Sequence, residues 1–172
     1  MLAPLVEVLP GLAMTVEERR AAVAEILAVL PAAGPYKVAR LVGVVPGLGA
    51  TVEECRAAVA RLLAVLPAAG PGVVAPLVGV LPGLEPTVEE RRAAVSAVLA
   101  VLPGAGPGVV ADLVEVLPGL EPTVEERRAA ASAVLAVVPA AEPRAAARRL
   151  VEVLRAFVAT QEWLNWLRTR AT

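Results

Sequence analysis

The feature that most constrains this chain is a motif that returns every 36 residues. The stretch Thr87-Val88-Glu89-Glu90-Arg91-Arg92 recurs from Thr15, Thr51 and Thr123, with Cys55 in place of the first arginine in the second copy. A fixed period of about 20–50 residues is typical of a solenoid, in which each unit buries its apolar surface only against its neighbours. We therefore expect stacked repeats rather than one irregular core.

The whole chain is expected to form one helical-repeat domain, 1–172. Its units span 5–40, 41–76, 77–112 and 113–148, and a C-terminal cap occupies 149–172. The last two units agree at 27 of 36 positions. Copies this similar indicate either recent duplication or an idealised, designed sequence, and the sequence does not separate these origins.

The second unit shows why the repeats should be helical. Thr51 is a candidate N-cap, Glu54 completes a capping box, and the helix should run to about Leu66. At helical spacing one face is apolar, and a second stripe is made of small residues. The predicted apolar face comprises Val52, Cys55, Val59, Leu62, Leu63 and Leu66, and the small stripe comprises Ala57, Ala60 and Ala64. A helix that touches both its hairpin partner and the next unit needs two such faces.

A shorter helix should follow in each unit, so the fold class is an all-α solenoid of helix pairs, of either handedness. Pro67 should end the first helix of the second unit, and the next should run from Pro71 or Val73 to Leu81. Pro76 either kinks this helix or begins it, and it should face solvent. Pro82-Gly83-Leu84 then fits a short 3₁₀ turn.

The two ends depart from the repeat. The chain starts partway through a second helix, which should leave an apolar side open to self-association unless Met1 and Leu2 fold over it. After 143 a longer helix is expected, followed by a cap from about Thr160 to Arg170 that buries Trp163 and Trp166. Residues 143–172 carry a net charge of +4 and the remainder −5.

Composition argues against several functions. Aromatic residues make up 2% and apolar residues 58%, so Leu, Val and Ala must form the interior. The net charge of −1 provides no overall attraction to nucleic acid or to an acidic membrane. There is no histidine, and Cys55 has no partner, so we expect no enzymatic activity, no cofactor and no metal site. Such cysteine usage is compatible with a reducing, intracellular compartment.

One uncharged run, residues 62–84, is long enough to span a bilayer. It contains four prolines and four glycines, which would leave backbone groups unpaired in lipid. We interpret it as parts of two short buried helices and a loop, and we expect no membrane insertion.

The unit resembles the repeats of mitochondrial transcription termination factors. The resemblance rests on paired helices followed by Pro-x-Leu, here Pro10-Gly11-Leu12, Pro46-Gly47-Leu48, Pro82-Gly83-Leu84 and Pro118-Gly119-Leu120, and it covers roughly residues 5–148. It implies two helices and a short third turn in each unit, a curved superhelix, and nucleic-acid binding on the concave side in an organelle. The matching positions are structural in that family.

The most regular polar feature is a ladder of four arginines, one in each unit: Arg20, Arg56, Arg92 and Arg128. Such a row could grip phosphates or acidic side chains. Alternatively, each arginine pairs with the glutamate three residues earlier on a solvated face. The neighbouring Arg19, Arg91 and Arg127 point toward the apolar stripe, so their stems should lie on apolar surface. Cys55 should be half-buried and inert.

A second candidate is the basic C-terminal region with Arg148, Arg149 and Arg155, which could contact nucleic acid beside the tryptophans or simply rim a cap. The sequence therefore predicts a non-enzymatic binding or scaffold module with a curved surface for a macromolecular partner. Its near neutrality favours a protein partner, or an idealised sequence that has no natural ligand. The alternative is nucleic-acid binding through the arginine ladder and the basic C-terminal region.

Overall fold

The computed structural model describes residues 15–137, 148, 151 and 152. Within these residues all regular structure is helical, and no strand occurs. The α-helices are α2 (Val16–Val29), α3 (Pro35–Val44), α4 (Val52–Val65), α5 (Pro71–Gly79), α6 (Val88–Val101), α7 (Pro107–Val116) and α8 (Val124–Val137). Short 3₁₀ helices connect them: η2 (Leu30–Ala32), η3 (Pro46–Leu48), η4 (Leu66–Ala68), η5 (Leu81–Leu84), η6 (Leu102–Gly104) and η7 (Leu117–Leu120).

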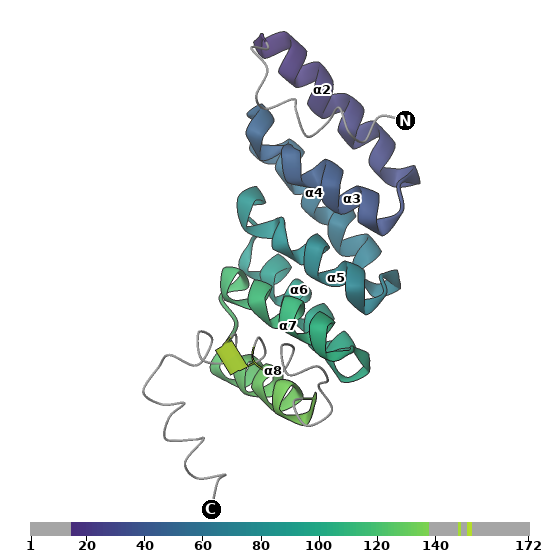
Figure 1. Ribbon diagram of the computed structural model, residues 1–172. Helices are drawn as coiled ribbons and strands as arrows, with labels where there is room; N and C mark the ends of the chain where they lie inside the picture. Colours follow the sequence, from purple (N-terminus) through teal and green to yellow (C-terminus); the bar gives the residue numbers. More distant parts are fainter. Residues whose placement is uncertain (1–14, 138–147, 149–150, 153–172) are drawn as a thin grey trace, which may run out of the picture.

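The helices stack in two layers along one axis (Figure 1). The longer helices α2, α4, α6 and α8 pack in succession, and the shorter helices α3, α5 and α7 form the second layer. The layers are joined because each short helix also packs on the long helix that follows it. The predicted all-α solenoid is thus confirmed for the described part of the chain.

Each long helix begins at a capping box, as its threonine and glutamate predict. In α4 the Thr51 amide donates to Glu54 Oε2 at 2.7 Å, and the Glu54 amide donates to Thr51 Oγ1 at 3.3 Å. The same reciprocal pair begins α2 and α6. These bonds satisfy donors that have no partner inside the helix. The carboxylates in the first turn of the helix also interact favourably with the positive end of its dipole.

The short helices begin at a Gly-Pro pair, with proline in the first helical position, where its missing amide costs little. Because α5 begins at Pro71, Pro76 does not begin the helix but lies inside it. Pro76 is exposed there, as expected. The helix ends at Gly79, two residues before the predicted end, because Leu81 already belongs to η5.

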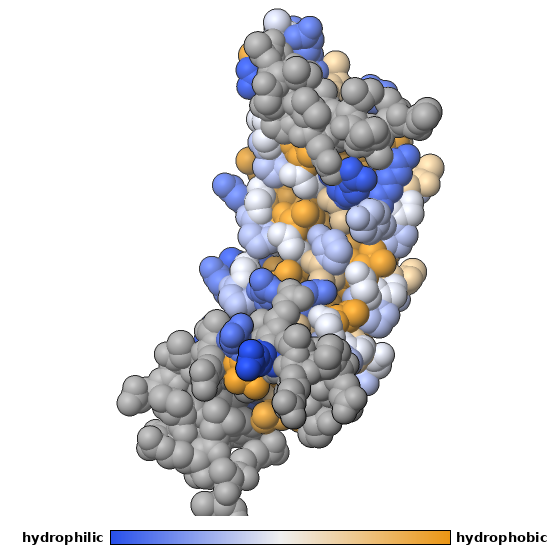
Figure 2. Space-filling model, viewed as in Figure 1, coloured by the Kyte–Doolittle hydropathy of each residue, from blue (hydrophilic) through white to orange (hydrophobic). Residues whose placement is uncertain are grey.

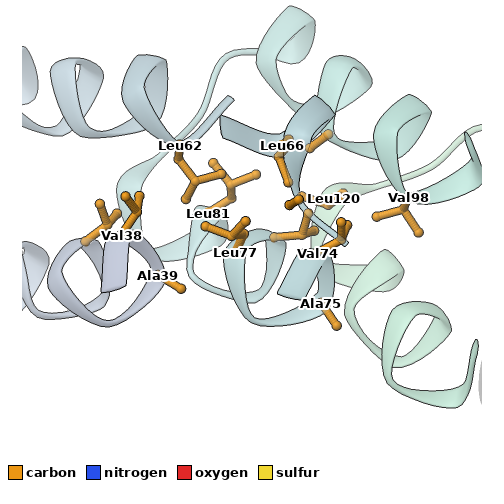
Figure 3. Packing of buried hydrophobic residues seen from close by; sticks show 14 of the residues in the cluster. Val38, Ala39, Leu62, Leu66, Val74, Ala75, Leu77, Leu81, Val98 and Leu120 are labelled. Atoms are coloured by element: carbon orange, nitrogen blue, oxygen red, sulfur yellow. The ribbon is translucent and has the colours of Figure 1, made fainter. Parts of the chain in front are cut away.

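The core is a continuous row of leucine, valine and alanine between the two layers. Leu62 of α4, Leu77 of α5 and Leu81 of η5 lie close together in Figure 3, and all three have no exposed surface. Burying each such side chain stabilises the fold by about 1.5–3 kcal/mol. Within the described ranges no charged or polar side chain is buried. Stability in this part of the chain therefore comes from apolar packing between successive units.

The predicted faces of the long helices are partly wrong. Val52 is 64% exposed, and the stripe Ala57, Ala60 and Ala64 faces solvent. The small residue that packs against the neighbouring unit is instead Ala58, which is fully buried, as are its equivalents Ala94 and Ala130. Each long helix therefore buries only one broad face. Its contact with the hairpin partner and its contact with the next unit share that face.

The turns after the short helices stack on one another along one edge. A Cβ placed on Gly83 would lie 3.6 Å from Pro46 Cγ, and one on Gly119 would lie 3.0 Å from Pro82 Cγ. The residue after each turn is left-handed, with φ of 70° at Gly49 and 52° at Glu85 and Glu121. Such φ values are unfavourable for glutamate by roughly 1–2 kcal/mol, so packing holds these two residues there.

Several predictions lie outside the described residues: the open N-terminal side, the long helix after 143, and the cap with Trp163 and Trp166. The uncharged run 62–84 forms the end of α4, η4, α5 and η5, as expected. Of the helices in the described part, none has both the length and the hydropathy to cross a bilayer.

Candidate functional site

The first turns of the long helices and the turns η3, η5 and η7 lie together along one side of the stack, which we call the long-helix edge. Each unit contributes the same pattern to it: an exposed valine at the first helical position, two glutamates, and one or two arginines. The four valines Val16, Val52, Val88 and Val124 are 54, 64, 48 and 40% exposed. These valines recur once in each unit, whereas the valines of the core are fully buried, and for this regularity we take the edge as a candidate binding surface.

The arginine ladder lies on this edge. Arg20, Arg56, Arg92 and Arg128 are all exposed, and each belongs to the first turns of a different long helix. Within the described ranges no ion pair links any of them to the glutamate three residues earlier. The ladder is thus presented to solvent in every unit, and the interpretation that each ladder arginine pairs with the glutamate three residues earlier is wrong for these residues.

The charge around the ladder is mixed, with acid in excess. Ten glutamates and seven arginines share the edge, a net charge of −3. The glutamates are Glu17, Glu18, Glu53, Glu54, Glu85, Glu89, Glu90, Glu121, Glu125 and Glu126, and the arginines are Arg19, Arg20, Arg56, Arg91, Arg92, Arg127 and Arg128. Carboxylates interspersed in this way oppose phosphates and weaken the case for a polyanion on this edge.

The arginines that precede the ladder residues make contacts that differ from unit to unit. Arg91 pairs with Glu121 of the next unit at 2.9 Å, with 27% and 71% of the two side chains exposed. Arg127 Nε donates to the Pro122 carbonyl at 3.1 Å. Arg19 is exposed. The expectation that these stems lie on apolar surface therefore agrees with the partial burial of Arg91 and Arg127, and not with Arg19.

Successive units meet at three junctions in the described residues: the first between α2 and α4, the second between α4 and α6, and the third between α6 and α8. Positions 36 residues apart show how these junctions differ. Arg19 is equivalent to Cys55 and Arg91, whereas Gly49 is equivalent to Glu85 and Glu121. The first junction thus has the arginine without the acid, the second has the acid without the arginine, and the third has both. Sequence reasoning missed this pairing, although the variation of both positions among the copies was a signal for it.

The first two junctions each contain a hollow on the long-helix edge. At the first junction it measures about 220 Å³ and is lined by Val16, Arg19, Arg20, Val23, Leu48, Gly49, Ala50, Thr51 and Glu54. At the second it measures about 500 Å³ and is lined by Pro46, Ala50, Val52, Cys55, Arg56, Gly83, Leu84, Glu85 and Thr87. The two linings share six equivalent positions, so the same place in the repeat is hollowed at both junctions. Two residues of the predicted ladder, Arg20 and Arg56, line these hollows.

Cys55 is half-buried in the larger hollow, as expected. Burial raises the pKa of its thiol, and the nearby carboxylates of Glu54 and Glu85 raise that pKa further. The thiolate is the nucleophilic form, so this environment opposes thiol reactivity near neutral pH.

On the opposite edge, one junction has an additional contact. Arg61 of α4 donates from Nε to the Leu30 carbonyl at 3.1 Å and from Nη2 to the Pro31 carbonyl at 2.6 Å. A guanidinium suits these carbonyls because they lie at the negative end of α2 and in the turn that follows it. The other copies have Glu25, Ala97 and Ala133 here, so this contact stabilises only the first junction.

The remaining predicted site residues lie near the C-terminus. Arg148 is helical and exposed, whereas Arg149 and Arg155 fall outside the described residues. On the face shown in Figure 2, apolar patches alternate with polar surface between the grey ends and do not merge into one large patch. Among residues 15–137, 148, 151 and 152, no three acidic, cysteine or histidine side chains are grouped as metal ligands would be.

Comparison with protein-family models, with curated proteins and with solved structures finds no match to this chain.

Proposed function

We propose that this chain is a non-enzymatic binding or scaffold module whose long-helix edge contacts a protein partner. The observation that carries the proposal is the repetition on that edge of an exposed valine, a hollow and closely spaced charges of both signs. Apolar contacts rimmed by mixed charge are typical of protein–protein interfaces. A solenoid suits this role because it repeats one local surface along its length.

The case against catalysis is chemical. The chain has no histidine, and within the described part no charged or polar side chain is buried. A general base or an activated nucleophile needs a partner and a desolvated setting, and no such pair is assembled on the long-helix edge. The one thiol there has a raised pKa, contrary to what a nucleophile requires.

A direct experiment is selection of random peptides on the immobilised full chain, followed by affinity measurement against variants. We expect selected peptides to lose affinity for Val52→Ser and Arg56→Glu, because both changes alter the long-helix edge. The matched control is Ala60→Ser, an exposed position on the same helix away from that edge. Selection of no peptide, or peptides that bind every variant equally, would overturn the proposal.

The alternative function is nucleic-acid binding through the ladder and the basic C-terminal region with Arg148, Arg149 and Arg155. Exposure of all four ladder arginines favours it, and the net charge of −3 on their edge opposes it. Titration of short duplex DNA at several salt concentrations separates the two. Phosphate contacts by four arginines would give a slope of log K against log salt of about −3.6. We expect no measurable binding even at low salt.

A further inference from the structure

Of the nine residues that line the hollow at the second junction, seven have an identical residue at the equivalent position of the third junction, where Pro86 replaces Ala50 and Arg91 replaces Cys55. At the third junction, the guanidinium of Arg91 bridges from α6 to Glu121 at the end of η7. At the second, Glu85 holds the same place at the end of η5 with the same φ of 52°, while the position equivalent to Arg91 is Cys55. The shorter side chain accompanies a hollow of about 500 Å³ beside Glu85.

The carboxylate of Glu85 is available for a new partner. No hydrogen bond or ion pair joins its side chain to another residue in the described ranges, and the residue is exposed. Glu85 and Cys55 line the same hollow, and the carboxylates of Glu54 and Glu85 contribute to the raised pKa of the Cys55 thiol. Glu54 is already engaged in the capping box with Thr51. Glu85 is therefore the carboxylate that can accept a cation.

Arg56 also lines the hollow, and its positive charge would repel an incoming cation. Its equivalent at the third junction, Arg92, directly follows Arg91, and the Arg91–Glu121 pair forms beside it. The third junction thus shows that an arginine at this ladder position tolerates a second guanidinium next to it. Arg56 does not prevent occupation of the hollow by a cation.

We propose that the hollow at the second junction binds an arginine side chain supplied by a protein partner, with its guanidinium on Glu85. This inference rests on the proposed function and specifies the partner's chemistry. The guanidinium takes the place that Arg91 occupies at the third junction, and the stem lies against Val52 and Leu84, which line the hollow. Val52, 64% exposed at the rim, favours a polypeptide over an isolated small cation because it provides apolar contact for flanking residues.

The test uses the full chain, labelled for NMR, and Nα-acetyl-argininamide as the probe. The neutral isostere Nα-acetyl-citrullinamide is the matched control, since it has the same shape without the charge. We expect saturable shifts of the Cys55 and Glu85 amides with the arginine probe only. Glu85→Gln should weaken binding by roughly 1.4–5-fold, the loss that one half-exposed ion pair predicts. Cys55→Arg should abolish the response, because its own guanidinium fills the hollow.

Equal shifts with both probes, shifts that do not saturate, or unchanged binding to Glu85→Gln would each overturn this inference. Such a result would leave the peptide selection standing, because selected peptides could still bind the valines and the ladder. Conversely, an arginine-specific response with no selectable peptide would reject the proposed function and retain a cation site. The two failures are therefore distinguishable.

Discussion

The second and third junctions stack in the same way but differ at their rims, where Cys55 at the second takes the position of Arg91 at the third. Both have the proline–glycine contact between turns, a leucine-rich core and a left-handed glutamate after the turn. At the third junction Arg91 bridges to that glutamate, whereas at the second Cys55 stands in the place of the arginine and a hollow lies beside Glu85. The core of a repeat protein thus constrains the architecture, while the rim of each junction can vary without changing the stack.

The largest expected effect tests whether the two junctions share one core. Leu81 and Leu117 are equivalent and have no exposed surface. Either leucine-to-alanine change should lower the free energy of unfolding by about 2–5 kcal/mol, because it leaves a cavity between units. Urea unfolding of both variants measures this loss. Losses that differ by more than about 2 kcal/mol would show that the junctions are not equivalent in their interiors.

The second comparison concerns the stacked turns. Gly119→Ala places a Cβ 3.0 Å from Pro82 Cγ, whereas Gly83→Ala places one 3.6 Å from Pro46 Cγ. The first change should cost about 1–3 kcal/mol through overpacking, and the second, at an ordinary contact distance, should be nearly neutral. Thermal and urea unfolding of the two variants provide the measurement. Equal costs would show that the turns adjust freely and that the closer contact is unimportant.

The third test converts one junction into the other. Cys55→Arg should stabilise the chain by about 0.2–1 kcal/mol, because a half-exposed ion pair with Glu85 is worth that much. The gain should shrink in 1 M salt and disappear in the Cys55→Arg, Glu85→Gln double variant. Unfolding free energies of the wild type, both single variants and the double variant complete the cycle. A gain that persists without Glu85 would mean that the arginine acts by packing alone.

The smallest effect concerns the thiol. Its raised pKa means less thiolate at a given pH. The rate of alkylation of Cys55 by iodoacetamide should therefore begin to rise at a higher pH in the folded chain than in the chain unfolded in urea. Glu85→Gln should move that profile to lower pH without restoring the unfolded value, because burial is the larger cause. The chain has no other cysteine, so total alkylation reports this site. An unchanged profile in Glu85→Gln would place the carboxylate too far away to act.

Much of the fold was predictable because its signals are local. Thr51 and Glu54 lie three residues apart, and their capping box sets the start of α4 whatever the helix packs against. The Gly-Pro pairs likewise begin the short helices. The exposure of Val52 and of the Ala57, Ala60 and Ala64 stripe was not predictable, because helical spacing shows which residues share a face and not which face a neighbour covers.

The candidate site was predictable only in part. The ladder residues Arg20, Arg56, Arg92 and Arg128 were found by periodicity, and their exposure follows from their place in the first turns. The contact between Arg91 and Glu121 joins residues 30 positions apart, so it depends on how one unit sits on the next. The hollow beside Glu85 and Cys55 has the same origin.

For the described residues, the sequence by itself determined the helix starts and the all-α class, because these follow from a 36-residue period and from bonds between residues three or four positions apart. Tertiary structure decided which alanine is buried, which arginine finds a carboxylate and where a hollow remains. Those outcomes depend on the distance between units, and that distance is set by side-chain packing across a junction rather than by any local pattern along the chain.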